Sequence, residues 1–345
     1  MPDVTQFQAD ADPVGPGGPK LRFPFASVAN GRHRWIVVAI RDQMPLVLLV
    51  VLLLAGGVLS GVFLTPQNIL NILWAVSVLG IVALGQTLLL ISANFDMSVG
   101  YSVGLAGVVT VLAQLNGFGL VPSIVIGLLI AAALGAFNGC VVVLTGASPF
   151  LITLGSGTLA FSVALALTQS KTLYAPIPEF TSIGQGQLGG GVYYSTLIFL
   201  CLAVALEFVL RRTTYGRTLF VLGTNETAGR LSGLRVARTK VITFVICGAL
   251  AGLAGLIVTS RNGSTVANVG VGYLFDSIIA AVLGGTSLFG GFGGTLRTVV
   301  GVIVLGVLGN LLILLNVPIE AQTIAKGVVF LTVVWADGVL RGTRA

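Results

Sequence analysis

Charge is what this sequence has least of. Its 18 basic and 11 acidic side chains make up 8% of 345 residues, whereas a soluble domain carries about 25% charged residues. Hydrophobic residues make up 55%, and the mean hydropathy is +1.03. So few charges cannot cover so large an apolar core, which argues against a soluble enzyme. The same hydrophobicity excludes a disordered chain, and the absence of a Gly-X-Y period excludes collagen.

Histidine and cysteine are scarce as well. The single histidine is His33, and the three cysteines, Cys140, Cys201 and Cys247, lie far apart within apolar runs. We therefore expect packing cysteines and no metal site. HExxH and helically spaced carboxylate pairs are also missing. The Gly-rich run at 283–294 lacks the Gly-Lys-Ser/Thr of a phosphate loop, so we expect neither catalysis nor a nucleotide site in this chain.

What the sequence has in quantity is long apolar segments and small residues, including 47 glycines. A membrane-spanning helix needs about 20 apolar residues, and small residues let such helices approach closely. We predict an all-α, polytopic integral membrane protein with a transmembrane domain over 45–340. The predicted spans are 45–64, 71–92, 98–116, 121–145, 149–168, 194–210, 241–260, 276–290, 298–316 and 321–339.

The net charge of +7 is unevenly distributed. Of the 18 basic residues, 14 fall in 1–44, 211–240 and 341–345, and such clusters mark cytoplasmic segments. We predict a cytoplasmic tail over 1–44, a cytoplasmic loop over 211–240, and both termini inside. The polar stretches 169–193 and 261–275 are then outside. Membrane topology and contact with lipid explain the charge, and we expect no nucleic-acid partner.

A weak internal repeat is present. Phe-Asp dipeptides at 95–96 and 275–276 open the third and eighth predicted spans, and Asn138 and Asn310 each precede a proline. These spans run in opposite directions in the predicted topology, as inverted repeats require. Coincidence in a biased composition is the alternative. Each aspartate of the two dipeptides is expected to cap the helix that follows it.

Polar residues within or beside the spans are mostly uncharged. Amides are costly in hydrocarbon unless they pair or face water, so either they bond between helices or they line a path for a polar, uncharged solute. The candidate pathway residues are Asn94, Asp96, Asn138 and Asn310; Gln86 is a further buried amide. Glu207 is the deepest carboxylate, and we expect it to pair with Arg211 one helical turn on.

Residues 224–234 predict a short cytoplasmic helix. Thr224 or Asn225 can cap its start, Glu226 favours the positive end of its dipole, and Gly233 can terminate it. So short a helix is marginal alone in water. We therefore expect it to dock onto a partner, the alternative being an ordinary basic loop.

Three motifs resemble those of ribose-type ABC transporter permeases, in the family's order and spacing. They are YGRTLFVLGTNETAGRLSGLRV at 215–236, AAVLGGTSLFGGFGG at 280–294, and FDMSVG at 95–100, which is similar to the family's Ile-Asp-Leu-Ser-Val-Gly. The resemblance runs from about residue 60 to the end of the chain. It departs at 93–95, where Gly-Gly-Ile is common, and at Gly229, where alanine is usual.

This resemblance implies the inner-membrane permease of a bacterial ATP-driven sugar importer. Two permease copies would form a homodimer, pair with a cytoplasmic ABC ATPase that uses ATP and Mg, and receive solute from a periplasmic or lipid-anchored sugar-binding protein. The permease itself would need no cofactor and would not be an enzyme. The resemblance assigns the predicted cytoplasmic helix to ATPase contact, through Asn225, Glu226, Arg230, Leu231, Ser232 and Gly233.

Other functions remain open on the residues alone. An ion-coupled secondary transporter of a polar solute and a membrane-embedded enzyme are the alternatives. Pentoses, hexoses, polyols and sugar-like signals are all compatible with the sequence.

Overall fold

The computed structural model describes residues 31–342, with side chains described for 43–332. Within that part the chain is almost entirely helical, which confirms an all-α polytopic protein. Each predicted span overlaps one helix. These helices are α1 (Gly31–Leu59), α2 (Pro66–Ile91), α3 (Val99–Leu115), α4 (Leu120–Thr145), α5 (Pro149–Thr168), α7 (Tyr194–Arg212), α10 (Val236–Asn262), α11 (Val271–Leu283), α12 (Thr295–Leu314) and α13 (Ile319–Gly342).

Six of these helices, α2, α4, α5, α7, α10 and α12, are long and apolar enough to cross a membrane by themselves. α3, α11 and the described apolar part of α1 are shorter. α1 begins at Gly31, inside the tail predicted for 1–44. Residues 1–30 and 343–345 lie outside the described residues, so the predicted cytoplasmic position of both termini stays a prediction.

Two long helices, α2 and α10, form the centre of the molecule. α2 packs against α10, α11 and α12, while α10 packs against α2, α3 and α4. This reciprocal pattern is what two interlocked repeats would produce. Small residues make the close contact possible: a β-carbon added to Gly248 of α10 would lie 2.5 Å from the Ala131 carbonyl oxygen of α4.

The outer helices present apolar side chains outward. Leu144 of α4 is 83% exposed, and Leu159 of α5 and Phe208 of α7 are likewise exposed. By contrast, α2 is buried almost continuously from Val76 to Ile91. A helix that is hydrophobic on all sides belongs in the interior, and exposed leucine and phenylalanine on the surrounding helices suit contact with lipid tails.

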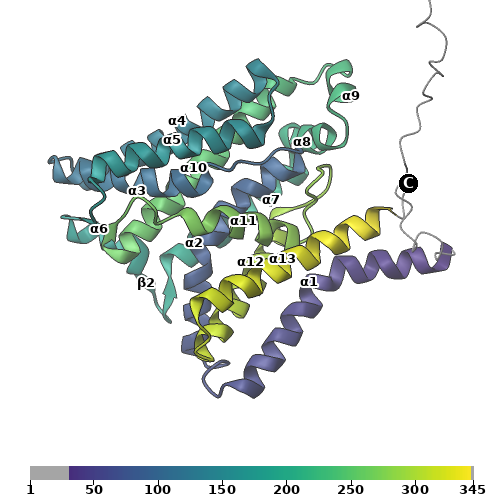
Figure 1. Cartoon of the computed structure of the whole chain (residues 1–345), viewed down its shortest axis with the longest axis horizontal. Coiled ribbons are helices and arrows are strands. Elements are labelled where there is room, and N and C mark those ends of the chain that lie inside the picture. The colour runs from purple at the N-terminus through teal and green to yellow at the C-terminus, as the bar shows by residue number, and fades with distance from the viewer. Residues whose placement is uncertain (1–30, 343–345) are drawn as a thin grey trace, which may run out of the picture.

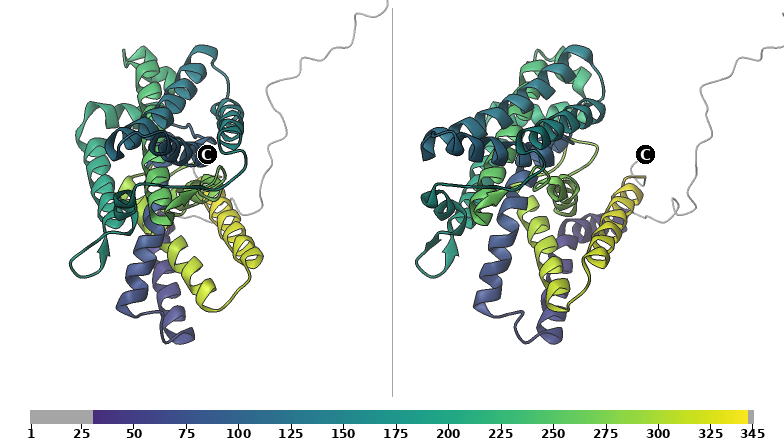
Figure 2. Two further views of the ribbon diagram at one scale, coloured as in Figure 1. Left: turned by 90° about the vertical axis from the view of Figure 1, so that its left-hand side faces the viewer. Right: turned by 60° about the vertical axis from the view of Figure 1, so that its left-hand side comes forward.

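The short elements gather at two opposite ends. At one end, β1 (Leu173–Tyr174) pairs antiparallel with β4 (Ser264–Thr265), next to α6 (Pro178–Gln185) and the hairpin of β2 (Gln187–Leu188) with β3 (Val192–Tyr193). At the other end lie α8 (Thr214–Thr224) and α9 (Glu226–Leu231). Figures 1 and 2 show this separation, and the 27 residues of α10 connect the two ends.

The eighth predicted span is displaced in the structure. The helix occupies 271–283, not 276–290, because the glycines after Leu283 end it early. Asp276 therefore lies within α11 and cannot cap its start, and the prediction that it does so is wrong. The proposed equivalence of the two Phe-Asp dipeptides fails with it, since Asp96 precedes α3. The Asp96 carboxylate accepts from the backbone N–H of Ser98 at 2.7 Å, but Ser98 itself occupies the N-cap position of α3, so Asp96 braces the residue before the helix and does not cap it directly.

Candidate coupling surface and solute pathway

The predicted cytoplasmic helix is the second of two short helices. The chain breaks between α8 and α9 at Asn225, whose backbone is extended (φ −160°, ψ 101°). The Asn225 side chain accepts a hydrogen bond from the Ala228 N–H at 2.9 Å. Of the two residues considered as the cap, the structure therefore selects Asn225.

Glu226 is the electrostatic centre of α9. Arg230 donates to its carboxylate at 2.6 Å, as the four-residue spacing predicts, and Lys240 of α10 donates to the other oxygen at 2.6 Å. Partial burial acts to raise the pKa of Glu226, but the hydrogen bonds and positive charges of Lys240 and Arg230 outweigh it and lower that pKa below its usual value. The contact with Lys240, which local spacing did not indicate, ties α9 to the start of α10.

The far end of α9 presents an apolar side chain to solvent. Leu231 is 85% exposed. Ser232 follows it and donates its hydroxyl to the Ala228 carbonyl at 2.9 Å. Gly233 has φ +76°, the left-handed backbone that favours glycine at a helix end. These two residues end the helix as the sequence indicates, and they leave Leu231 at its tip.

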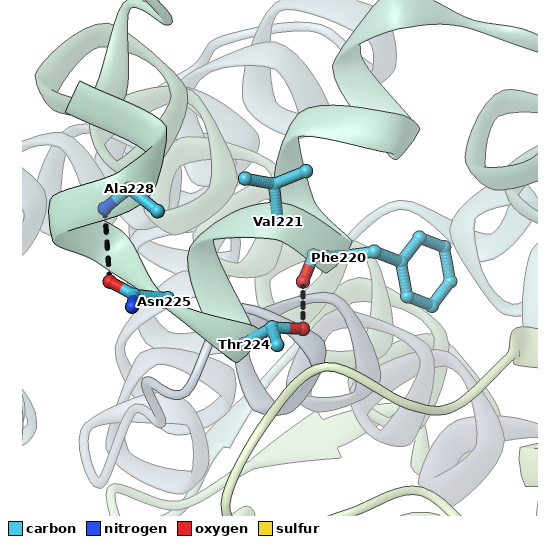
Figure 3. Close-up of a pocket in the computed structure, with 5 residues that line it drawn as sticks. All are labelled: Phe220, Val221, Thr224, Asn225 and Ala228. Atoms are coloured by element: carbon cyan, nitrogen blue, oxygen red, sulfur yellow. Dashed lines mark hydrogen bonds between the residues drawn. The ribbon is translucent and has the colours of Figure 1, made fainter. Parts of the chain in front are cut away.

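A shallow groove of about 330 Å³ lies where α8 meets α9. Figure 3 shows its lining by Phe220, Val221, Thr224, Asn225 and Ala228. We name these five residues, together with Glu226, Arg230 and Leu231, the coupling surface. It combines a groove, an exposed leucine and an ion pair on one small area of the surface.

The Gly-rich segment after α11 packs between α8, which carries part of the coupling surface, and the end of α2. The Gly291 N–H donates to the Ile91 carbonyl oxygen at 2.9 Å, so this loop holds the last turn of α2. Gly223 of α8 lies against both: a β-carbon there would be 1.9 Å from the Ile91 oxygen and 2.3 Å from the Gly291 nitrogen. This junction of Ile91, Gly223 and Gly291 joins the coupling surface to the end of the central helix.

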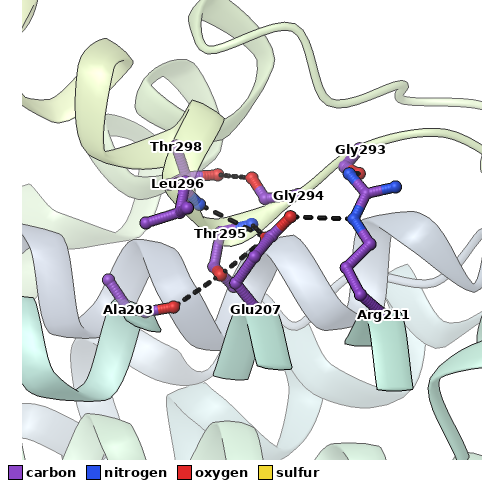
Figure 4. A network of polar contacts seen from close by, with 8 residues as sticks. All are labelled: Ala203, Glu207, Arg211, Gly293, Gly294, Thr295, Leu296 and Thr298. Atoms are coloured by element: carbon purple, nitrogen blue, oxygen red, sulfur yellow. Dashed lines mark hydrogen bonds and ion pairs between the residues drawn. The ribbon is translucent and has the colours of Figure 1, made fainter. Parts of the chain in front are cut away.

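Glu207 fixes the other side of the same loop (Figure 4). Arg211 donates to it at 2.9 Å, which confirms the predicted pair. Glu207 also accepts from the backbone N–H of Thr295 at 2.7 Å and from the Thr295 hydroxyl at 2.9 Å. The carboxylate therefore caps α12 from a neighbouring helix, a role that the spacing along α7 alone did not indicate.

A buried polar network lies beyond the junction, where α2 leads into α3. The Ser98 hydroxyl donates to the Asp96 carboxylate at 2.6 Å, and the Asn138 amide donates to that hydroxyl at 2.9 Å. Gln86 of α2 donates to the Asp96 carbonyl at 2.6 Å and accepts from the Asp96 N–H at 3.1 Å. We name Gln86, Asp96, Ser98 and Asn138 the Asp96 network. It connects α2, α4 and the segment preceding α3.

The four candidate pathway residues are only partly brought together. Asp96 and Asn138 share the network, and the Oδ1 atom of Asn138 has no hydrogen-bond partner among the described residues. Asn94 is buried beside them and donates to the Ser92 carbonyl at 2.7 Å. Asn310 lies apart, in a reciprocal amide pair with Asn68 of α2 at 2.9 Å. That pair fits the interhelix alternative.

Comparison with known proteins adds to this geometry. Residues 68–334 match the family model described as branched-chain amino acid transport system / permease component. The chain is 36% identical to the ribose import permease protein RbsC of Haemophilus influenzae, over 88% of this chain and 94% of that protein. It is 31% identical to the D-allose transport system permease protein AlsC of Escherichia coli (84% and 89%). It is 30% identical to the xylose transport system permease protein XylH of Haemophilus influenzae (81% and 90%).

Proposed function

Because the chain belongs to the ribose-type family of sugar ABC-importer permeases, we propose that it forms a homodimer driven by a separate cytoplasmic ATPase. The coupling surface is the observation that carries the proposal. An exposed leucine next to a groove and a charge pair is the composition of a protein contact, in which an apolar centre is surrounded by polar groups. Asn225, Glu226, Arg230, Leu231, Ser232 and Gly233 are assigned to ATPase contact.

The junction behind this surface gives the proposed contact a route into the membrane. A movement of α8 and α9 meets the end of α2 through backbone contacts at Gly223, with no flexible side chain between them. α2 also carries Gln86, which holds the backbone of Asp96. We propose that ATPase closure shifts this assembly and alters the path at Asn94, Asp96 and Asn138. Asn310 stays a pathway candidate with weaker support, because its amide is already paired.

The solute we propose is a neutral sugar or sugar-like molecule, delivered by an extracytoplasmic binding protein. The ribose, D-allose and xylose named in the relatives' titles are polyhydroxylated and uncharged. The amides and hydroxyls of the Asp96 network suit such a solute, because hydroxyl groups both donate and accept hydrogen bonds.

Uptake by intact cells tests the energy source. Cells that express the chain with its ATPase and binding protein should accumulate a labelled sugar, lose that uptake when ATP is depleted, and keep it when the proton gradient alone is collapsed. Uptake that survives ATP depletion but fails with the proton gradient would favour the ion-coupled alternative. A Gly155→Ala variant is a suitable control, since a β-carbon there meets nothing within 4 Å.

The proposed orientation has its own test. Ser182 of α6 and Thr227 of α9 are both exposed and lie at opposite ends of the molecule. A cysteine at position 182 should react with an impermeant thiol reagent applied from outside, and a cysteine at position 227 should react only in opened cells. The opposite pattern would reverse the proposed topology. Thr239 is a poor choice of inner site, because burial at 8% exposure would protect it in either orientation.

A further inference from the structure

An ion pair inside the apolar region lies outside every site described above. Lys326 of α13 donates to the Asp276 carboxylate of α11 at 2.6 Å. Asp276 is the sixth residue of its helix and Lys326 the eighth. At 1.5 Å per residue, they lie about 8 and 10 Å along their helices. Both helices begin at the end where β4 lies, since α11 follows β4 and α12 crosses the molecule before α13. The pair is therefore one to two turns inside the proposed extracytoplasmic entrance.

The pair is not enclosed within the chain. The Lys326 side chain is 31% exposed and that of Asp276 is 21% exposed. Charged side chains within membrane spans almost always face a bundle interior or a water-filled cavity, because a charge at the centre of a spanning helix is costly in contact with lipid. The open side of this pair must then face water or other protein.

The apolar face of α13 lies elsewhere. Ile324, Val328 and Leu331 are 58–67% exposed, and at 100° per residue Ile324 lies about 200° around the helix from Lys326. Thr323, three residues before Lys326, is exposed on the lysine's side of the helix, about 60° around from it. The side of α13 that suits lipid is therefore nearly opposite the side that bears the lysine.

From this arrangement we infer that Asp276 and Lys326 line the solute pathway near its extracytoplasmic entrance and bind the hydroxyl groups of the passing sugar. The carboxylate accepts hydrogen bonds and the ammonium group donates up to three. The pair adds no net charge, which suits a neutral solute better than an ion. The inference rests on the proposed transport function and adds two positions that the predicted pathway residues did not include.

A structural role is the competing explanation. α13 packs against α11 and α12, so the ion pair also fastens α13 to the rest of the molecule. Two measurements separate the two explanations. The first needs no sugar, and the second uses radiolabelled ribose, D-allose and xylose in turn as probes.

The first measurement asks whether the pair faces water. Thr323→Cys and Ile324→Cys place thiols at two exposed, adjacent positions of α13, the first on the side of Lys326 and the second on the apolar face. A charged, impermeant thiol reagent attacks the thiolate, which forms in water and not in an apolar environment, so we expect labelling of Thr323→Cys to be about tenfold faster or more than that of Ile324→Cys. Equal, slow labelling of both variants would overturn the inference. The parent protein, with Cys140, Cys201 and Cys247 in place, sets the background.

The second measurement separates solute binding from fastening. Replacing a buried ion pair with apolar residues of similar volume is often neutral for stability, so the double variant Asp276→Leu, Lys326→Met should retain normal abundance in the membrane. Its sugar uptake should fall about tenfold, as for the loss of about 1.4 kcal/mol of solute interaction. Uptake equal to that of the parent would show that the pair only fastens α13 and would overturn the inference.

The two measurements also distinguish a failure of this inference from a failure of the proposed transport function. Thiol labelling reports water access whether or not the parent transports sugar. If the parent transports none while Thr323→Cys is labelled rapidly, the proposed function fails and the water-facing position of the pair stands.

Discussion

The coupling surface and the Asp96 network are both built from polar side chains, but they are held in different ways. Within the coupling surface the bonds join residues three or four apart, such as Asn225 to Ala228 and Glu226 to Arg230, although Glu226 also bonds the more distant Lys240, and the groups are partly or largely exposed. In the Asp96 network the bonds join residues up to 40 apart, and the groups are almost fully buried. Exposed local pairs contribute little to folding, so we expect the coupling surface to act through a partner. Buried networks contribute to the permease fold itself.

The junction between the two regions should give the largest effect, because it belongs to both. Gly223→Val places side-chain atoms against the Ile91 and Gly291 backbones, neither of which can rotate away. Overpacking of this kind costs about 1–3 kcal/mol and occasionally more. We expect reduced permease abundance in membranes together with loss of the ATPase. Normal abundance and normal uptake in Gly223→Val would show that the two regions are not joined here.

The Asp96 network should give the next largest effect, without loss of the partner. Asn138→Leu removes the donor to Ser98 and one buried amide, a change that costs about 1–3 kcal/mol. We expect a lower melting temperature in detergent and impaired uptake, with the ATPase retained on purification. Asn310→Leu is the matched comparison, because it breaks an amide pair away from the network and should lower stability with a smaller loss of uptake. Equal transport by Asn138→Leu and the parent would reduce Asn138 to a packing residue.

The capping carboxylate of α12 should give a smaller effect. Glu207→Gln keeps an acceptor for Thr295 but removes the charge that faces the helix dipole, which costs about 1–2 kcal/mol in a partly buried position. We expect a modest fall in the melting temperature of the purified permease. An unchanged melting temperature in Glu207→Gln would mean that the backbone bonds alone hold the Gly-rich loop.

The smallest expected effect is a pH dependence of the coupling surface. The pKa of Glu226 is lowered in the folded protein, so its contribution is present above the ordinary glutamate pKa and is lost as pH falls through the lowered value. With the group about a third exposed, the contribution is about 0.2–1 kcal/mol. Protease cleavage near α9 in purified permease should increase as the solution is acidified through that range. Glu226→Gln should lack this dependence, and an identical pH profile for both proteins would exclude Glu226 as its source.

Features that depend on residues close together in the chain could be predicted from the sequence. Hydropathy located a helix at every predicted span, and local spacing gave the Asn225 cap, the Glu226–Arg230 pair and the left-handed Gly233. Each of these depends on residues within one or two turns of a helix, so no knowledge of the fold was needed.

Contacts between distant segments could not be predicted in this way. Lys240 reaches Glu226 from the next long helix, and Lys326 reaches Asp276 across 50 residues. These partners depend on which helices pack together, and the spacing of residues along one sequence does not show that packing. The early start of α11 has the same origin, because it places Asp276 within the helix, where Lys326 of a distant helix compensates its charge. The early end of α11 is different, since the glycines that cause it are visible in the sequence.

Retention of the ATPase during purification tests the central claim most directly, since it separates the coupling surface from the permease fold. Permease and ATPase are expressed together and purified in detergent as the parent, as Glu226→Ala and as Gly233→Val. Losing one partner of a charge pair buried by docking costs about 2–5 kcal/mol, which weakens the complex tenfold or far more. We predict equal amounts of permease in all three, with ATPase bound to the parent and lost from both variants. Variants that retain the ATPase and transport normally would contradict the account and leave 211–240 as an ordinary basic loop.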